Sequence, residues 1–388
     1  MAKLFIIDSN TNERIPFLRG VLVESLVRTG LSFQEAYLVA QAIRDALEED
    51  SKITTNTLRE RVSQELRKRF GKSIAKLYDQ RFNQDRQIMV QTSNDELPFS
   101  VGILSRSLRA CAIHRADALE TAKQVHDSLL KAGTMHIHHT DLKQVIYKHL
   151  LEHSSASDAE RFISWRSFKG SGLPLIILAG GITGTGKSTL TTELAYQLNI
   201  VRTQSTDMMR EIVRCYLPSS EIPTLAYSSF EAWRGLQNVD QYAEARPTEL
   251  IEGFLSQFNV VKQGLEATIH RAVKENHDLI VDGVHVLPSR LDLDIFRDQA
   301  VVVPLMLVVQ KKKTLGKRLK QRAREQPERT SSRYLKRLDQ IWQLQSYLVS
   351  EAEQHQIPLI VNNDIDEALH EILMHISKII IQRFPCGS

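Results

Sequence analysis

Hydrophobic and polar residues follow two different patterns along the chain, and the pattern changes at about residue 170. Before that point apolar residues recur at three- and four-residue spacing, which is typical of amphipathic helices. After it, short runs rich in β-branched residues are apolar throughout, as strands buried on both faces of a parallel sheet are. We therefore expect an α/β fold with a doubly wound parallel sheet, preceded by a mainly α-helical part. The predicted strands are 175–179, 201–205, 278–282, 301–309 and 358–361, and the predicted helices between and after them are 187–197, 207–217, 260–276, 311–325, 331–354 and 365–383.

The helical part contains one pattern twice. Residues 15–26 and 97–108 share Pro, Phe, Gly, Leu, Ser and Leu at an offset of 82, and apolar positions stay matched through three helices. The third helix is matched at an offset of 84, after a two-residue insertion. We interpret the match as a domain duplication, because two unrelated helical stretches would rarely stay aligned for so long. Each copy is expected to begin with a short strand, at 4–7 and at 88–90, and to continue with helices. Those helices are predicted at 18–29, 33–48 and 55–70, and at 100–111, 115–131 and 140–153.

Domain boundaries follow from this duplication. We expect the first repeat at 1–84, the second at 85–166 and the α/β domain at 170–388. The segment 167–174 contains Gly, Ser and Pro and is predicted to be the linker before the α/β domain.

Composition excludes several classes of protein. The chain is 42% hydrophobic and 25% charged, which excludes collagen-like and broadly disordered chains. No apolar run reaches the ~18 residues of a membrane span, and the start lacks the basic and apolar regions of a secretory signal. The three cysteines, Cys111, Cys215 and Cys386, lie far apart in sequence, show no paired spacing for a metal and are not an even set for disulfides. We expect a cytoplasmic protein without a membrane partner.

A phosphate-binding loop is the strongest motif in the sequence. Residues 181–188 match the pattern G-x-x-x-x-G-K-[ST] and lie between a predicted strand and a predicted helix. Its glycines let backbone amides turn toward phosphate oxygens, Lys187 would bridge the β- and γ-phosphates, and the Ser188 hydroxyl would bind Mg²⁺. The alternative is a glycine-rich turn that binds no nucleotide. ATP and Mg²⁺ are the expected cofactors, and the predicted nucleotide-binding residues are Gly181, Thr183, Gly184, Thr185, Gly186, Lys187, Ser188 and Thr189.

Two acidic residues follow predicted strands of the same sheet. Asp282 ends the strand at 278–282 and is the expected metal ligand beside Ser188, unless it only caps the next turn. Asp207 follows the strand at 201–205, and the carboxyl edge of a parallel sheet is where substrates bind. Asp207 is therefore expected to orient or deprotonate an acceptor hydroxyl, the alternative being a helix N-cap.

Basic residues occur at two places that point to anion binding. Arg210 and Arg214 lie four residues apart on one predicted helix face and could bind an anionic acceptor, or be solvated charges. The segment 311–337 holds twelve Lys or Arg and two Glu in a chain whose net charge is only +4, so the rest of the chain is acidic. We interpret 311–337 as a lid whose arginines neutralise transferring phosphate, rather than a nucleic-acid-binding helix, because Tyr334 is its only aromatic residue. Its candidate residues are Arg318, Arg322, Arg324, Arg329 and Arg333.

A histidine cluster invites a metal interpretation that the spacing does not support. His136, His138 and His139 have no further Cys or His at ligand spacing, so we expect a surface link between helices there.

With these motifs established, the chain resembles two known families. The repeats resemble ATP-cone domains, the nucleotide-sensing modules that regulate ribonucleotide reductases and some other enzymes. The α/β part is similar to the P-loop kinase domain of the 2-phosphoglycerate kinase family at 180–189, 205–210, 281–288 and 333–335, and 98–108 is similar to the segment preceding that domain. The family often has Glu-Gly where this chain has Asp282-Gly283, and one cone is expected where this chain has two. The cone signature also has a basic pair in its first hairpin, which the turns at 8–13 and 92–96 lack.

The resemblance implies a reaction and roles for named residues. ATP would phosphorylate the 3-hydroxyl of 2-phosphoglycerate, giving 2,3-bisphosphoglycerate. Lys187, Asp207, Arg322 and Arg324 would be catalytic, and the acceptor would be held by Arg210, Arg214, His285 and Arg329.

Further hypotheses remain open beside this one. A regulatory nucleotide at the cones and a homo-oligomer are two of them, and each cone could equally have a structural role. The rival functions are a kinase for a phosphorylated polyol or a polynucleotide 5′-hydroxyl, and a nucleotide-gated regulator without phosphoryl transfer.

Overall fold

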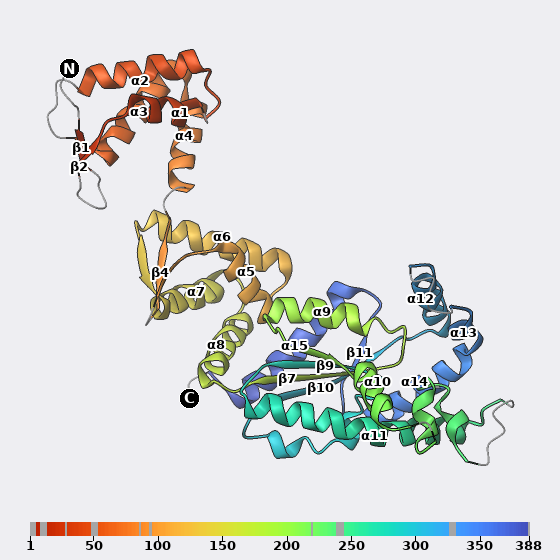
Figure 1. Cartoon of the computed structure of the whole chain (residues 1–388). Coiled ribbons are helices and arrows are strands. Elements are labelled where there is room, and N and C mark those ends of the chain that lie inside the picture. The colour runs from red at the N-terminus through yellow and green to blue at the C-terminus, as the bar shows by residue number, and fades with distance from the viewer. Residues whose placement is uncertain are drawn as a thin grey trace. The chain divides into compact units, whose positions relative to one another are not determined.

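The computed structural model describes residues 5–7, 14–27, 29–47, 53–84, 87–92, 95–218, 220–237, 244–325 and 331–386 (Figure 1). The side chains at 15, 80–84, 322–325 and 331–332 are outside the described set. By internal packing the chain divides into two units, residues 1–99 with 126–142 and residues 100–125 with 143–388. This division cuts through the second repeat, so packing units and sequence repeats do not coincide.

The first repeat is a small sheet with four helices. Its elements are β1 (Phe5–Ile7), β2 (Arg14–Pro16), α1 (Arg19–Val27), α2 (Phe33–Leu47), β3 (Ile53–Thr54), α3 (Thr55–Phe70) and α4 (Lys72–Gln84). β1 pairs antiparallel with β2 and parallel with β3. Thr54 caps α3 by accepting a hydrogen bond from the Thr57 amide, and the buried Leu26, Val39 and Leu66 lie in one apolar core.

The second repeat has the same elements in the same order. They are β4 (Met89–Gln91), β5 (Glu96–Pro98), α5 (Val101–Ala110), α6 (Arg115–Lys131), β6 (His136–His138), α7 (His139–His153) and α8 (Ala156–Ser171). Its strand order, β5-β4-β6, repeats the β2-β1-β3 order of the first copy with the same strand directions. The two copies therefore share one topology, as a duplicated domain would.

One prediction in this part of the chain is refined and another is wrong. The segment between α6 and α7, expected as a surface link, is strand β6, in which the exposed His136 and the partly exposed His138 lie. The expected linker at 167–174 is helical as far as Ser171, and α8 ends at Gly172 in the left-handed region. The apolar face of α8 continues this far because Phe162, Trp165 and Phe168 are buried, with Trp165 Nε1 donating to Ser377 Oγ at 2.9 Å. Burial of this face outweighs the helix-breaking tendency of Gly170 and Ser171.

The C-terminal part is an α/β fold on one parallel sheet. Its strands are ordered β11 (Leu359–Val361), β10 (Val301–Val308), β7 (Leu175–Gly180), β9 (Leu279–Gly283) and β8 (Thr203–Ser205), all parallel. Helices cover both faces, with α9 (Lys187–Leu198) and α15 (Ile365–Arg383) on one and α11 (Pro247–Lys274) on the other (Figure 1). The remaining α-helices are α10 (Thr206–Tyr216), α12 (Lys312–Glu325), α13 (Ser331–Lys336) and α14 (Leu338–Gln354).

Element boundaries agree with the sequence at most places. The strand at the centre of the sheet is buried at all six positions, as an uninterrupted apolar run predicts. Two helices differ: α11 begins at Pro247 rather than near 260, and the helix predicted at 331–354 is broken at Arg337 into α13 and α14. No described helix is both long enough and apolar enough to cross a membrane.

The register of the parallel sheet determines which strand ends lie at the same level. Gly180 lies opposite Gly283, and Ser205 lies opposite Asp282, so β7, β8 and β9 all end at the same level. Everything that follows these strand ends is therefore brought to one edge of the sheet.

Candidate active site

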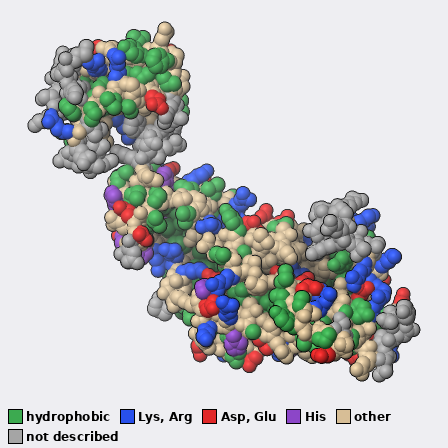
Figure 2. Space-filling model, in the orientation of Figure 1, with side chains coloured by type: hydrophobic (Ala, Val, Ile, Leu, Met, Phe, Trp, Pro, Cys, Tyr) green, Lys and Arg blue, Asp and Glu red, His purple; other side chains and the backbone are tan. Residues whose placement is uncertain are grey.

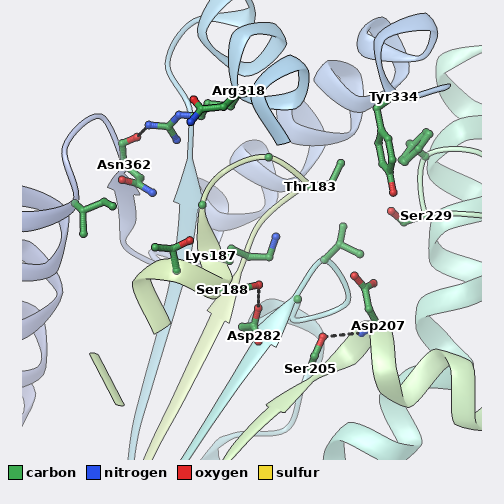
Figure 3. Close-up of a pocket in the computed structure, with 18 of the residues that line it drawn as sticks. Thr183, Lys187, Ser188, Ser205, Asp207, Ser229, Asp282, Arg318, Tyr334 and Asn362 are labelled. Atoms are coloured by element: carbon green, nitrogen blue, oxygen red, sulfur yellow. Dashed lines mark hydrogen bonds between the residues drawn. The ribbon is translucent and has the colours of Figure 1, made fainter. Parts of the chain in front are cut away.

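The phosphate-binding loop joins β7 to α9 at the carboxyl edge of the sheet (Figure 3). Three of its residues, Gly181, Gly184 and Gly186, have φ of +142°, +84° and +86°, where side chains are strained. A Cβ on Gly186 would lie only 2.4 Å from Asn362 Nδ2. Glycine is thus required here by conformation and by close approach together, and the loop has the shape that the motif predicts.

Lys187 and Ser188 open helix α9 and face the cleft (Figure 3). Lys187 Nζ donates to the Ile182 carbonyl at 2.7 Å, which holds the ammonium against the phosphate-binding loop. Ser188 Oγ donates to Asp282 Oδ2 at 3.3 Å. Burial raises the pKa of the Asp282 carboxyl, while the Lys187 ammonium and the Ser188 hydroxyl act in the opposite direction. A hydroxyl and a carboxylate in contact are the oxygen ligands that Mg²⁺ prefers, so this pair suits the predicted metal.

Asp207 lies in the first turn of α10 and lines the same cleft. The cap of α10 is Ser205, whose Oγ accepts a hydrogen bond from the Asp207 amide at 3.3 Å. Asp207 is therefore not the N-cap, and its carboxylate is directed across the cleft from Lys187 (Figure 3). This placement suits a group that orients or deprotonates a hydroxyl.

These residues line one cleft of about 800 Å³. It extends from the loop after β11, past the phosphate-binding loop, to the segment 228–230 and Tyr334. Its described lining comprises Thr183, Gly184, Gly186, Lys187, Ser188, Thr189, Ser205, Asp207, Arg210, Ser228, Ser229, Phe230, Asp282, Gly283, Val284, Arg318, Gln321, Tyr334, Asn362, Asn363, Asp364, Ile365 and Asp366. Of the predicted loop residues, Thr185 is fully buried and Gly181 is not among the lining residues.

The two arginines of α10 do not have equal positions. Arg210 lines the cleft, and its guanidinium donates to the Tyr227 carbonyl at 2.8 Å and to Glu211 Oε1 at 2.6 Å. Arg214 pairs with Glu211 Oε2 at 3.1 Å and is not among the lining residues. The predicted acceptor contact therefore suits Arg210, whereas Arg214 neutralises Glu211 from outside the cleft.

His285 is completely buried and does not line the cleft. Its Nε2 lies 2.7 Å from Gln257 Oε1, and the Gln257 amide group donates to the carbonyls of Thr224 and Tyr227. Tyr227 also accepts the bond from Arg210, so a buried chain of hydrogen bonds leads from His285 to Arg210. His285 was expected to contact the acceptor directly, and this expectation is wrong. Its side chain instead supports Arg210 through the hydrogen bonds of Gln257 and Tyr227.

Arg318 is the predicted arginine of the lid, residues 311–337, that contacts the phosphate-binding loop. Arg318 lies against the phosphate-binding loop, where its guanidinium donates to the Thr185 carbonyl at 3.2 Å and to the Asn362 carbonyl. The other predicted site residues of the lid lie outside the described set: the side chains of Arg322 and Arg324, and the whole of Arg329. Figure 2 shows several Lys and Arg side chains around α13.

Sequence reasoning missed the residues that follow β11. Asn362 is 3% exposed, its Nδ2 donates to the Thr185 carbonyl at 2.8 Å, and its Oδ1 has no hydrogen-bond partner among the described residues. Asp364 and Asp366 line the cleft beside it. The signal was present, because these residues follow a predicted strand and must reach the same sheet edge as Asp207 and Asp282.

The chain is similar in sequence to curated 2-phosphoglycerate kinases. It is 33% identical over 282 residues to the 2-phosphoglycerate kinase of Pyrococcus furiosus, which covers 73% of this chain and 90% of that protein. It is 34% identical over 294 residues to the 2-phosphoglycerate kinase of Methanopyrus kandleri, with 76% and 88% covered. No family model matches the chain. A solved shikimate kinase from Bacteroides thetaiotaomicron covers 52% of this chain at 15% identity with a TM-score of 0.26.

Proposed function

The chain belongs to the 2-phosphoglycerate kinase family, and on this premise we propose that it phosphorylates the 3-hydroxyl of 2-phosphoglycerate with Mg·ATP. It is a kinase, a phosphotransferase with an alcohol group as acceptor. The observation that carries the proposed reaction is that Lys187, the Ser188–Asp282 pair and Asp207 face one another across a single cleft (Figure 3).

The phosphoryl transfer would proceed by in-line displacement. The acceptor oxygen forms a bond to the γ-phosphorus while the bond from that phosphorus to the bridging oxygen breaks, so ADP leaves. Asp207 receives or orients the hydroxyl proton, and Lys187 stabilises the negative charge on the phosphates. The amides of the phosphate-binding loop and Arg318 hold the nucleotide in place. Mg²⁺, held by Ser188 and Asp282, would supply charge neutralisation at the phosphates.

Acceptor binding is proposed at the Asp207 end of the cleft. Arg210 is mostly buried there and fixed by the Tyr227 carbonyl and Glu211, so its guanidinium is preorganised for a carboxylate or phosphate. Arg322, Arg324 and Arg329 remain proposed lid residues that close over the phosphates.

We propose that the two repeats are ATP-cone modules that sense a nucleotide. If so, coupling must be reciprocal, and an effector that changes acceptor affinity by some factor must have its own affinity changed by the same factor. Titrating ATP and dATP in the presence and absence of acceptor tests this. The alternative is that the repeats only join copies of the chain into a homo-oligomer, which light scattering with and without nucleotide would show. We place the enzyme in the cytoplasm because the proposed reaction consumes ATP.

The decisive experiment is ADP release by the full chain with Mg·ATP across a panel of acceptors. The panel contains 2-phosphoglycerate, 3-phosphoglycerate, glycerate, inositol phosphates and a 5′-hydroxyl RNA. Turnover with 2-phosphoglycerate that Lys187→Ala lowers by about 10²–10³-fold or more supports the proposal. Lys274→Ala, which changes an exposed lysine at the end of α11 outside the cleft, is the matched control and should be fully active.

Other outcomes separate the rival functions. Activity on a different acceptor would retain the kinase and discard 2-phosphoglycerate. Activity on RNA that falls steeply with salt would favour the polynucleotide 5′-hydroxyl. Nucleotide binding without turnover of any acceptor would favour a nucleotide-gated regulator.

A further inference from the structure

A buried carboxylate lies beside the acceptor end of the cleft without lining it. Glu231, just before the short helix at Ala232–Gly235, is 3% exposed and has three arginine partners. Arg333 Nε donates to Glu231 Oε2 at 2.6 Å, Arg337 Nε lies 3.3 Å from Oε1, and Arg234 Nη1 lies 3.9 Å from Oε1. Among the described residues, no other carboxylate forms an ion pair with these three arginines. A single buried acid therefore organises three cations.

Glu231 joins two segments that both line the cleft. It directly follows Ser228–Phe230 in sequence, and all three of those residues line the cleft. Its partner Arg333 lies in α13 next to Tyr334, which lines the cleft from the lid side and whose ring centroid lies 5.6 Å from that of Phe230. Figure 3 shows Ser229 and Tyr334 on the Asp207 side of the cleft, away from Asn362. The ion pair between Glu231 and Arg333 thus holds α13, which is part of the lid, against the segment 228–230 at the acceptor end of the cleft.

The charges at this point suit an anion. One carboxylate opposite three guanidinium groups leaves an excess of two positive charges next to the cleft. Buried ion pairs hold a defined geometry, and removing one partner leaves the others without compensation. We infer that Glu231 is a positioning residue for the acceptor: it fixes Arg333, Arg337 and the 228–230 wall so that the acceptor end keeps its width and its positive charge. This inference rests on the proposed function, because it requires the acceptor to bind on the Asp207 side.

The test compares Glu231→Gln with the same substitution at a partly buried glutamate elsewhere, Glu351. Glu351 accepts hydrogen bonds from Arg290, Tyr347 and Ser289, its side chain is 12% exposed, and it does not line the cleft. Glu231→Gln is expected to raise the KM for acceptor by about 10- to 100-fold, as a displaced binding group does, with the KM for ATP unchanged. Glu351→Gln should change neither. Arg333→Gln, whose side chain is 45% exposed and so tolerant of substitution, should raise the acceptor KM in the same direction.

A second measurement does not depend on the acceptor. Trypsin should cut the lid, residues 311–337, faster in Glu231→Gln than in the unmodified protein or Glu351→Gln, because cleavage follows local opening. Equal cleavage rates, or KM values for ATP and acceptor that rise together, would overturn the inference. Failure of the unmodified enzyme to use 2-phosphoglycerate would overturn the proposed function instead. The KM ratio would then be measured with whichever acceptor of the panel is turned over.

Discussion

Lowering the pH from 7 to 5 is expected to destabilise the C-terminal unit through one buried side chain, His285. The Gln257 amide group donates to two carbonyls, so its oxygen faces His285 Nε2, which must then carry the proton. The other ring nitrogen, Nδ1, is buried without a hydrogen-bond partner among the described residues. A proton added there would place an unpaired charge in the core, next to the hydrogen-bond chain that leads through Gln257 and Tyr227 to Arg210.

The magnitude follows from the pKa. Burial lowers the pKa of His285 from 6.5 to about 4, and the nearby charges of Arg210 and Lys187 act in the same direction against Asp207. Between these two values the unfolded chain binds the proton and the folded chain does not, so stability is full above pH 6.5 and is lost as the pH falls toward 4. At pH 5 the loss amounts to about 2 kcal/mol, which is a large fraction of the stability of a typical domain.

Urea unfolding at pH 7 and pH 5 measures this loss. The three tryptophans, Trp165, Trp233 and Trp342, all lie in the C-terminal unit, so their fluorescence reports its unfolding. His285→Gln keeps an amide that can donate to Gln257 but cannot titrate, and the comparison removes contributions from other histidines such as His375, whose pKa is also lowered by burial. The unmodified protein should lose about 2 kcal/mol more than the variant between the two pH values. Parallel losses in both proteins would refute this account of His285.

Three further predictions concern the cleft. Gly186→Ala should abolish turnover, because φ is +86° and the new Cβ would lie 2.4 Å from Asn362 Nδ2. Gly264 is a helical position where a Cβ would have no atom within 4 Å. Gly264→Ala should therefore stabilise the protein by about 0.5–1 kcal/mol in the same unfolding assay. Burial raises the pKa of Asp282, so on acidification this carboxylate should become protonated, and lose Mg²⁺, at a higher pH than an ordinary aspartate. The Mg²⁺ concentration that gives half-maximal activity should therefore increase as the pH falls. A Mg²⁺ requirement that stays constant down to pH 4 would contradict this. Ser205→Ala removes the cap of α10 and should cost about 1 kcal/mol in unfolding free energy and lower kcat, an effect that Ser205→Thr should largely restore.

Features that depend on neighbours in the chain were determined by the sequence itself. The phosphate-binding loop, the Asp282 strand end and the five strands of the sheet were predicted close to where they lie. Each has a local cause: glycines that permit positive φ, or an uninterrupted apolar run that only a doubly covered strand can bury. The duplication could also be found this way, because matched apolar positions encode the same packing twice.

Partners brought from distant segments were decided only by the tertiary structure. Arg210 and Arg214 look equivalent on a helix, yet only Arg210 lines the cleft, because Tyr227 lies beside it. His285 was expected at the acceptor and is instead fully buried against Gln257, 28 residues away in sequence.

The ion pair between Glu231 and Arg333 spans 102 residues, and the contact of Asn362 with Thr185 spans 177. No periodicity or spacing marks such pairs, because their geometry depends on how helices and strand ends pack around one sheet edge. The sequence alone therefore determined which chemical groups reach that edge, and the packing of the sheet and its helices determined which of them face the cleft.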